Sequence, residues 1–326
     1  MKIKQLTLLI MAIGLSGVAA ARNSTPPAAE LAPQPKWFIG GDAIYGETGH
    51  DNAIFASGPN TASVQTQFVA DRNDEWGFKV WAGYDAGKGA SYWVDWFRFH
   101  NDGKTSTTPT VFASFLPPTF VSAVSRSQLT GKQESDVDQV TVQIGHEFKS
   151  LNGSNIKVHA GAQALLLEAT NVYTGTAAGA GNLSAFNAAE KSDFDGGGVV
   201  VGVDLEHMCG NSFSIFSRNQ VGLVYGRLGS NFNSFNDGTG ATLASMSTEN
   251  RYTILPTLNA ELGAAYTVQL ASMDLRIQAG VRGTVVVDGV QNYTSTTTDD
   301  RYNWTEASIF FGGQVAFSNL GGLFSS

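Results

Sequence analysis

Charged side chains recur at alternate positions within apolar stretches of this sequence. Arg276 lies between a leucine and an isoleucine, and Glu261 lies between an alanine and a leucine. Successive residues of a strand face opposite sides of a sheet, so charges in this spacing share one face. Charges gathered on one face can pair with each other, or line a water-filled passage and select among ions. The candidates for lining or selectivity are Lys79, Glu147, Lys157, Arg218, Glu261, Arg276, Arg282 and Glu306.

Other reactive residue types form no catalytic or metal motif. His50 and His100 lie in or beside predicted long connections, where such a group can activate a hydroxyl but is more often a solvated surface residue. The segment from Asp195 has three glycines but lacks the downstream Gly-Lys-Ser/Thr of a phosphate loop. Cys209 is the single cysteine, which excludes an internal disulfide and a cysteine-based metal site. We therefore expect no enzyme, no metal site and no cofactor.

Ten stretches of the chain alternate apolar with polar or small residues, as strands do when their two faces meet different environments. Each is about nine residues or longer, which is enough to cross a bilayer when tilted. Single-chain bacterial barrels have an even number of strands. We therefore predict an all-β fold: a transmembrane antiparallel up-and-down β-barrel of about 10 strands. The stretches are 37–45, 76–85, 91–99, 139–148, 156–166, 198–206, 213–225, 252–266, 274–285 and 306–317.

The connections between these stretches alternate in length, as long extracellular loops and short periplasmic turns do. An apolar part of the second long connection, 111–124, leaves room for two more strands, which would give 12. Pro256 predicts a bulge or a strand that begins after it, because proline donates no ladder hydrogen bond. The long connections are 46–75, 100–138, 171–193, 229–251 and 288–303, and the short ones are 86–89, 149–154, 207–211 and 267–272.

Aromatic residues collect near the predicted strand ends. Transmembrane barrels carry such residues as girdles at the two membrane interfaces. Aromatics are also common in strands in general, but that preference does not explain their position at the ends. We predict that two girdles include Trp37, Tyr45, Trp76, Tyr84, Tyr92, Tyr225, Tyr252, Tyr266 and Phe317.

Composition agrees with a membrane barrel. Charged residues make up 15% of the 326 residues, against about 25% in soluble domains. The net charge of −8 argues against nucleic acid as a partner. After the predicted signal peptide, no run of 18 apolar residues follows, so we expect no transmembrane helix. The expected partners are outer-membrane lipid, lipopolysaccharide and the machinery that assembles barrels.

The N-terminal residues predict secretion. Lys2 and Lys4 precede an apolar run, and three alanines at 19–21 suit signal peptidase. The apolar run is shorter than the roughly 20 residues that a membrane helix needs. We predict a signal peptide at 1–21, a proline-rich periplasmic lead-in at 22–35, and an outer-membrane barrel with long extracellular loops at 36–326.

Several segments resemble the Legionella major outer membrane protein family. They are WFIGGDAIYG (37–46), SDFDGGGVVVGVDLEHMCGNSFSIFSRNQVGLVYGR (192–227), ILPTLNAELGAAYTV (254–268) and LRIQAGVRG (275–283). The resemblance implies a pore-forming barrel in the outer membrane of a Gram-negative bacterium. It implies no catalytic residues. The chain departs from many outer-membrane proteins in ending on serine rather than on an aromatic residue.

Two functions remain open from the sequence. Inward charges can line a narrow porin-like channel for small hydrophilic solutes or ions. They can instead pair across the lumen, which would leave a non-conducting structural or adhesin-type barrel whose loops contact a host surface. Strand order places Arg218, Glu261 and Arg276 on consecutive strands, so we expect a charged ladder along one wall.

The loop asymmetry predicts which connections are accessible on intact cells. Epitope tags inserted in 100–138 or 171–193 should bind antibody, and a tag in 86–89 should not. The measurement is surface labelling of whole cells. Labelling of the 86–89 tag would reverse the direction assigned to the barrel.

Overall fold

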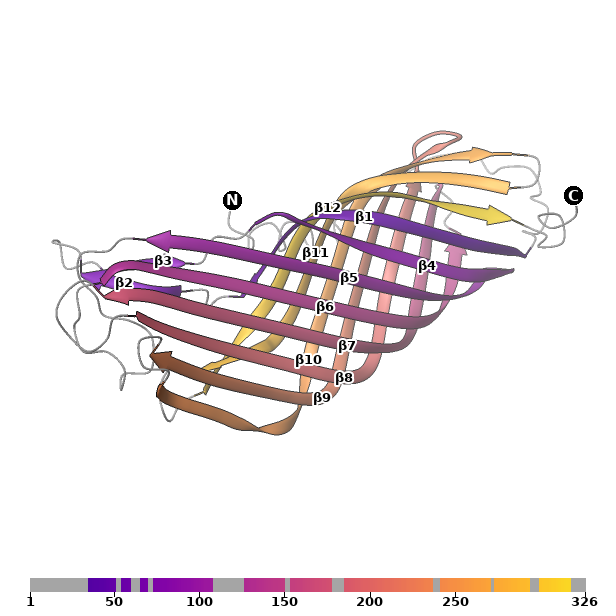
Figure 1. Ribbon diagram of the computed structural model, residues 1–326. Coiled ribbons are helices and arrows are strands. Elements are labelled where there is room, and N and C mark those ends of the chain that lie inside the picture. Colours follow the sequence, from indigo (N-terminus) through magenta and orange to yellow (C-terminus); the bar gives the residue numbers. More distant parts are fainter. Residues whose placement is uncertain are drawn as a thin grey trace, which may run out of the picture.

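A computed structural model describes residues 35–50, 54–59, 65–69, 73–107, 126–149, 153–177, 185–236, 241–270, 273–293 and 299–317. The predicted signal peptide, most of the predicted lead-in and the stretch 111–124 lie outside these residues. Every regular element in the described part of the chain is a strand (Figure 1). No helix there is long and apolar enough to cross a membrane.

Ten strands close into one antiparallel barrel in the order β1-β12-β11-β10-β9-β8-β7-β6-β5-β4, which confirms the predicted fold. Each strand pairs with its neighbour along the chain, and β1 pairs with both β4 and β12 to close the ring. The strands are β1 (Lys36–His50), β4 (Glu75–Gly87), β5 (Ala90–Thr107), β6 (Arg126–Lys149), β7 (Ser154–Ala177), β8 (Ala185–Met208), β9 (Phe213–Asn236), β10 (Ala241–Gln269), β11 (Met273–Tyr293) and β12 (Asp299–Phe317).

The alternation in sequence becomes an alternation of exposure across the wall. Val199, Val201 and Leu223 are each more than half exposed on the outer face of the barrel. Gln278 and Glu306, at inward positions, are almost completely buried. This agrees with the inward parity inferred from the sequence. It also shows that the lumen is packed at these positions.

Several strands run further than the alternating pattern predicted. The chain is still in β7 at Ala177 and re-enters the sheet in β8 at Ala185, within the connection predicted at 171–193. In the same way β5 and β6 extend into 100–138, and β9 and β10 extend into 229–251. These extensions carry Ser, Thr and Asn on both faces, and backbone pairing continues without apolar alternation. The first long connection contains a separate hairpin, β2 (Ile54–Pro59) and β3 (Gln65–Val69).

The two ends of the barrel therefore differ. At the end that we call the short-turn end, brief connections join β4 to β5, β6 to β7, β8 to β9 and β10 to β11. At the other, the long-strand end, β5 to β9 run side by side and project together toward the left of Figure 1. The described pairing of β10 with β11 stops at Thr257–Val286, although β10 remains paired with β9 as far as Ala241.

Pro256 lies where the β10–β11 ladder begins. The described pairing of β10 with β9 runs through Pro256 without a shift, and its register shifts lie earlier in β10, between Thr242 and Ala244 and between Thr248 and Arg251. The predicted bulge at Pro256 is therefore wrong, and so is a strand start after it. Proline cannot donate to a ladder, and in the described residues β11 pairs with β10 only from the next residue, Thr257.

A new charge should destabilise the folded barrel more on its outer face than on its lumen face. Val221 is 48% exposed on the outer face, and the neighbouring Gln220 lines a polar cavity in the lumen. Val221→Arg should reduce the free energy of folding into bilayers by roughly 2–4 kcal/mol, and Gln220→Arg should reduce it much less. Urea titration of folding into lipid vesicles measures both. Equal losses would contradict the assignment of faces.

Candidate functional site

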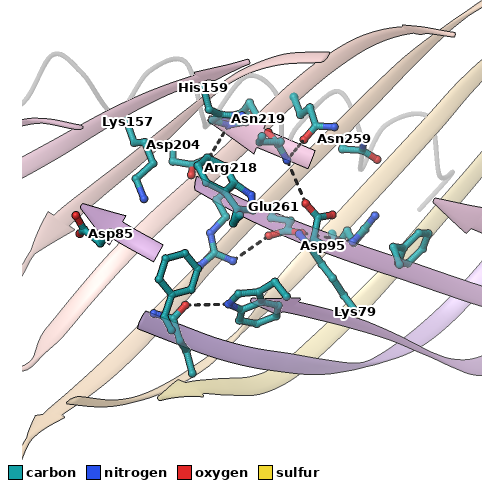
Figure 2. Close-up of a pocket in the computed structure, with 18 of the residues that line it drawn as sticks. Lys79, Asp85, Asp95, Lys157, His159, Asp204, Arg218, Asn219, Asn259 and Glu261 are labelled. Atoms are coloured by element: carbon teal, nitrogen blue, oxygen red, sulfur yellow. Dashed lines mark hydrogen bonds and ion pairs between the residues drawn. The ribbon is translucent and has the colours of Figure 1, made fainter. Parts of the chain in front are cut away.

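A cavity of about 380 Å³ occupies the short-turn half of the lumen. Its lining reaches from Lys36 and Asp274, near the first residues of their strands, to Glu261 and Arg282 deep in the barrel. Figure 2 shows charged and amide side chains that converge on it from several strands. The cavity is therefore polar along its length.

Glu261 is the centre of a buried ion cluster at the inner end of this cavity. Its carboxylate lies 2.9 Å from Lys79 Nζ, 3.2 Å from Arg218 Nη1 and 3.5 Å from Arg282 Nη1. The register of the sheet places Arg218 on β9 and Arg282 on β11 directly opposite Glu261 on β10. Lys79 reaches it from β4 across the lumen. Arg282 also pairs with Glu306 through Nε at 3.3 Å.

The remaining predicted lining residues lie outside this cluster. Arg276 does not join Glu261, because the register sets it opposite Thr267, and it pairs instead with Glu206 at 2.6 Å. The expected ladder of Arg218, Glu261 and Arg276 is therefore wrong in its third member. Lys157 lies over the ring of Trp93, with Nζ 5.4 Å from the centroid. Among the described residues, Glu147 forms no ion pair and does not line the cavity.

Amide side chains link the strands around the cluster. Gln163 accepts a hydrogen bond from Gln139 and donates one to Thr257. Gln278 donates to both carboxylate oxygens of Asp42 and accepts from Arg218. These residues carry no formal charge, so the charge pattern of the sequence does not identify them. Their signal was the glutamine that recurs at inward positions of β6, β7 and β11.

A layer of apolar side chains fills the lumen beyond the cluster, toward the long-strand end. The sequence reasoning missed it, because apolar residues were assigned to the outer face. Trp304, Val290 and Leu255 have no measurable exposure. The layer sits directly on the ion cluster, since the Arg282 guanidinium lies 3.8 Å from the centroid of the Phe97 ring. Its residues are Ile44, Phe97, Phe99, Val137, Leu165, Leu167, Phe194, Val224, Leu228, Leu255, Val286, Val290 and Trp304. Two further buried rings, Phe216 and Phe310, lie on the short-turn side of the cluster, where Phe216 contacts Arg218 and Arg276.

Part of this layer comes from residues 287–293 and 299–303, the described outer ends of β11 and β12, which we call the hairpin tip. In the described residues, Val290–Tyr293 pairs only with β12 and Asp299–Tyr302 only with β11. The tip contacts β8, where the backbone N–H of Gln291 donates a hydrogen bond to Ser192 Oγ at 3.0 Å. Arg301 donates to Thr253 on β10 at 3.0 Å. These contacts and the complete burial of Val290 and Gln291 place the described part of the tip within the lumen.

The start of the tip shows why it can bend inward. The register between β11 and β12 shifts after Val286, and Asp288 has a φ of 56°. A Cβ at Gly289 would lie 2.9 Å from Leu167 Cδ2 on β7, so glycine permits this close approach. At the base of the tip, Trp304 Nε1 donates to Ser135 Oγ on β6 at 2.5 Å.

The predicted girdle residues fall into two groups. Trp37, Tyr84, Tyr92, Tyr266 and Phe317 lie at or near the short-turn ends of their strands. In the other group, Trp76 lies at the outer end of β4 and Tyr45 lies opposite it on β1, whereas β9 and β10 continue well past Tyr225 and Tyr252 toward the long-strand end. In this group Tyr225 and Tyr252 stack at 5.6 Å, and Tyr45 and Trp76 meet at 4.9 Å.

The described residues hold no group of three or more His, Cys, Asp or Glu side chains placed to bind a metal. His100 lies 2.7 Å from Asp136 in an exposed pair on neighbouring strands. Cys209 is a free, exposed thiol.

A closed antiparallel barrel with an apolar outer face and a polar lumen defines the class of outer-membrane β-barrels. A family model described as the Legionella pneumophila major outer membrane protein precursor matches residues 32–317. The chain belongs to this family, and it is an outer-membrane protein.

Solved barrels resemble it more distantly. The outer membrane protease OmpT of Escherichia coli matches with a TM-score of 0.44 and 10% identity, over 90% of this chain and 99% of that one. The CymD monoaromatic hydrocarbon channel matches with a TM-score of 0.32 and 13% identity, over 94% and 96%. Neisserial surface protein A matches with a TM-score of 0.27 and 11% identity, over 87% and 97%. No curated protein matches the chain.

The shared carboxylate predicts a large effect of one substitution. Glu261→Gln leaves Lys79, Arg218 and Arg282 without their common partner in a buried site. Removing one partner of a buried ion pair costs roughly 3–5 kcal/mol, so the variant should unfold at lower urea concentration. Glu147→Gln is the control, because Glu147 forms no ion pair in the described chain. Equal stability of the two variants would show that the cluster is solvated.

Proposed function

We propose that this protein is a narrow outer-membrane channel for small hydrophilic solutes or ions, described here in a closed state. The observation that carries the proposal is the polar cavity, which leads from the short-turn end into the lumen and stops at the ion cluster and the apolar layer. Charged and amide side chains along a passage suit hydrated solutes. Ten strands enclose far less space than the 16 to 18 strands of large porins, so the passage is narrow.

The hairpin tip is the part that can open this passage. Wall strands cannot leave the barrel without exposing backbone hydrogen-bonding groups to lipid, which costs several kcal/mol for each group. The tip carries its own β11–β12 pairing, and the described pairing attaches it to neither β10 nor β1. Moving it outward would break the contacts at Ser192 and Thr253 and expose Val290. Opening therefore leaves the wall intact.

The orientation in the outer membrane is proposed from the signal peptide and from the lengths of the connections. We propose that the signal peptide at 1–21 directs secretion and that the short-turn end faces the periplasm, as short turns do in bacterial barrels. The assembly machinery would insert the chain, and lipopolysaccharide would surround the outer half. The extended strands at the long-strand end would then stand outside the cell, where they can contact a host surface. We propose no catalytic role.

A second candidate is a permanently closed structural or adhesin-type barrel. The complete burial of Trp304, Val290 and Glu306 favours it, because packed side chains at these positions leave no room for water. In that case the hairpin tip is part of the core and does not open.

A disulfide across the tip separates the two candidates. Ser192 Oγ accepts a hydrogen bond from the Gln291 backbone amide at 3.0 Å, so the two positions are close enough for a disulfide to be tested. In a Cys209→Ser background, Ser192→Cys with Gln291→Cys should abolish the conductance of the refolded protein in planar bilayers, and a reductant should restore it. Each single cysteine variant is the control.

Two results would contradict a gated channel. The first is a parent protein that never conducts, even when the tip is deleted, which would leave the structural barrel standing. The second is full conductance with the disulfide closed, which would place the passage elsewhere.

A further inference from the structure

We propose that the cavity in the short-turn half of the lumen binds a small zwitterion, an amino acid or a short peptide that carries both an ammonium and a carboxylate. The inference names the solute class of the proposed channel. Transport of this ligand rests on the proposed channel function, but its binding requires only the cavity.

The charges that line the cavity are balanced in number, but not all of them are paired. Lys36 pairs with Asp274, His159 lies 3.2 Å from Asp204, and Glu261 holds its three cations. These groups are already compensated. The lining contains Lys36, Lys79, Lys157, Arg218 and Arg282 as cations and Asp85, Asp95, Asp204, Glu261 and Asp274 as anions.

Lys157 and two carboxylates remain for a ligand. In the described chain, the Lys157 ammonium contacts the face of Trp93 and forms no ion pair. The carboxylate of Asp85 accepts a hydrogen bond from the Gly87 amide, and that of Asp95 accepts one from Gln143. All three residues line the cavity, and in the view of Figure 2 Lys157 and Asp85 are drawn on the left and Asp95 on the right. One cation and two anions that form no ion pair in the described chain therefore border the same space, although Lys157 also lies opposite Asp204 and Asp95 also interacts with Lys79 and Arg282.

Polar atoms deep in the cavity also lack partners. Gln143 and His159 are each about 5% exposed. Gln143 Oε1 and His159 Nδ1 have no hydrogen-bond partner among the described residues. A buried polar atom without a partner costs about 1–3 kcal/mol. Both atoms are themselves buried, so a ligand would remove that cost only where its binding reorients the Gln143 or His159 side chain.

Shape and charge together select the class of ligand. The volume of about 380 Å³ lies at the small end of the range for ligand pockets, which suits one or two amino-acid residues. The rings of Trp81 and Trp93 offer apolar surface to a methylene or peptide plane. A simple anion would satisfy Lys157 and face two carboxylates, and a simple cation would leave Lys157 unpaired. A zwitterion offers a carboxylate to Lys157 and an ammonium to the carboxylates, so the cavity should bind it more tightly than an ion of one sign.

Calorimetric titration of the full barrel, refolded in detergent micelles, tests the proposal. The probes are glycine, diglycine and triglycine, with N-acetylglycine as the carboxylate-only analogue and glycinamide as the ammonium-only analogue. At least one zwitterion should bind saturably, and both analogues should bind at least tenfold more weakly. The same ratio should persist with the Ser192–Gln291 disulfide closed, so that binding is measured apart from conductance.

Paired variants assign the charges. Lys157→Met and Asp85→Asn should each weaken binding of the zwitterion at least tenfold. Lys191→Met and Asp195→Asn are the matched controls, because both residues lie in exposed ion pairs away from the cavity and should leave binding unchanged. The heat-modified gel shift confirms that each variant is folded.

Three results would overturn the inference. They are no saturable binding of any zwitterion, equal binding of the single-charge analogues, or folded Lys157 and Asp85 variants that bind as well as the parent. A protein that binds zwitterions without conducting would retain this inference and lose the proposed channel. A protein that conducts without binding zwitterions would retain the proposed channel and lose this inference.

Discussion

The shared carboxylate of Glu261 is the interaction on which the interior of this barrel depends. Three cations from β4, β9 and β11 converge on it, so a single side chain from β10 compensates charge from strands on both sides and across the lumen. Buried charges are costly unless they are paired and hydrogen-bonded. The amides of Gln278 and Gln163 extend this pairing around the wall. The cluster thereby sets the floor of the polar cavity.

The apolar layer has a different physical role from the cluster. Its members exclude water from the long-strand half of the lumen, and exclusion of water strengthens the ion pairs beneath it. Arg282 links the two, because its guanidinium pairs with Glu306 and Glu261 and also contacts Phe97. The hairpin tip contributes to the layer without belonging to the closed wall. The closed wall and the hairpin tip are therefore distinct parts of the described chain, and the proposed opening would move only the tip.

The fold could be predicted from sequence because one face of a membrane-spanning strand meets lipid and the other meets the lumen. Val221 and Leu223 alternate with Gln220 and Gly222, and that period alone predicts the strand and its faces. The pairing of Arg218 with Glu261 followed from strand order. The partner of Arg276 did not, because it depends on the register between β10 and β11. The apolar lumen was missed where both faces are apolar, as in the run Leu165–Leu167. Contacts across the lumen, such as Ser192 with Gln291, have no local signal in the chain.

The position of the hairpin tip inside the lumen is the central claim, and amide hydrogen exchange at Gln291 tests it most directly. Measured by NMR on the refolded protein, this amide should exchange as slowly as those of the surrounding wall, because it donates to Ser192 Oγ in a fully buried site. Exchange at the rate of an exposed loop, with the wall amides still protected, would show that the tip lies outside the barrel.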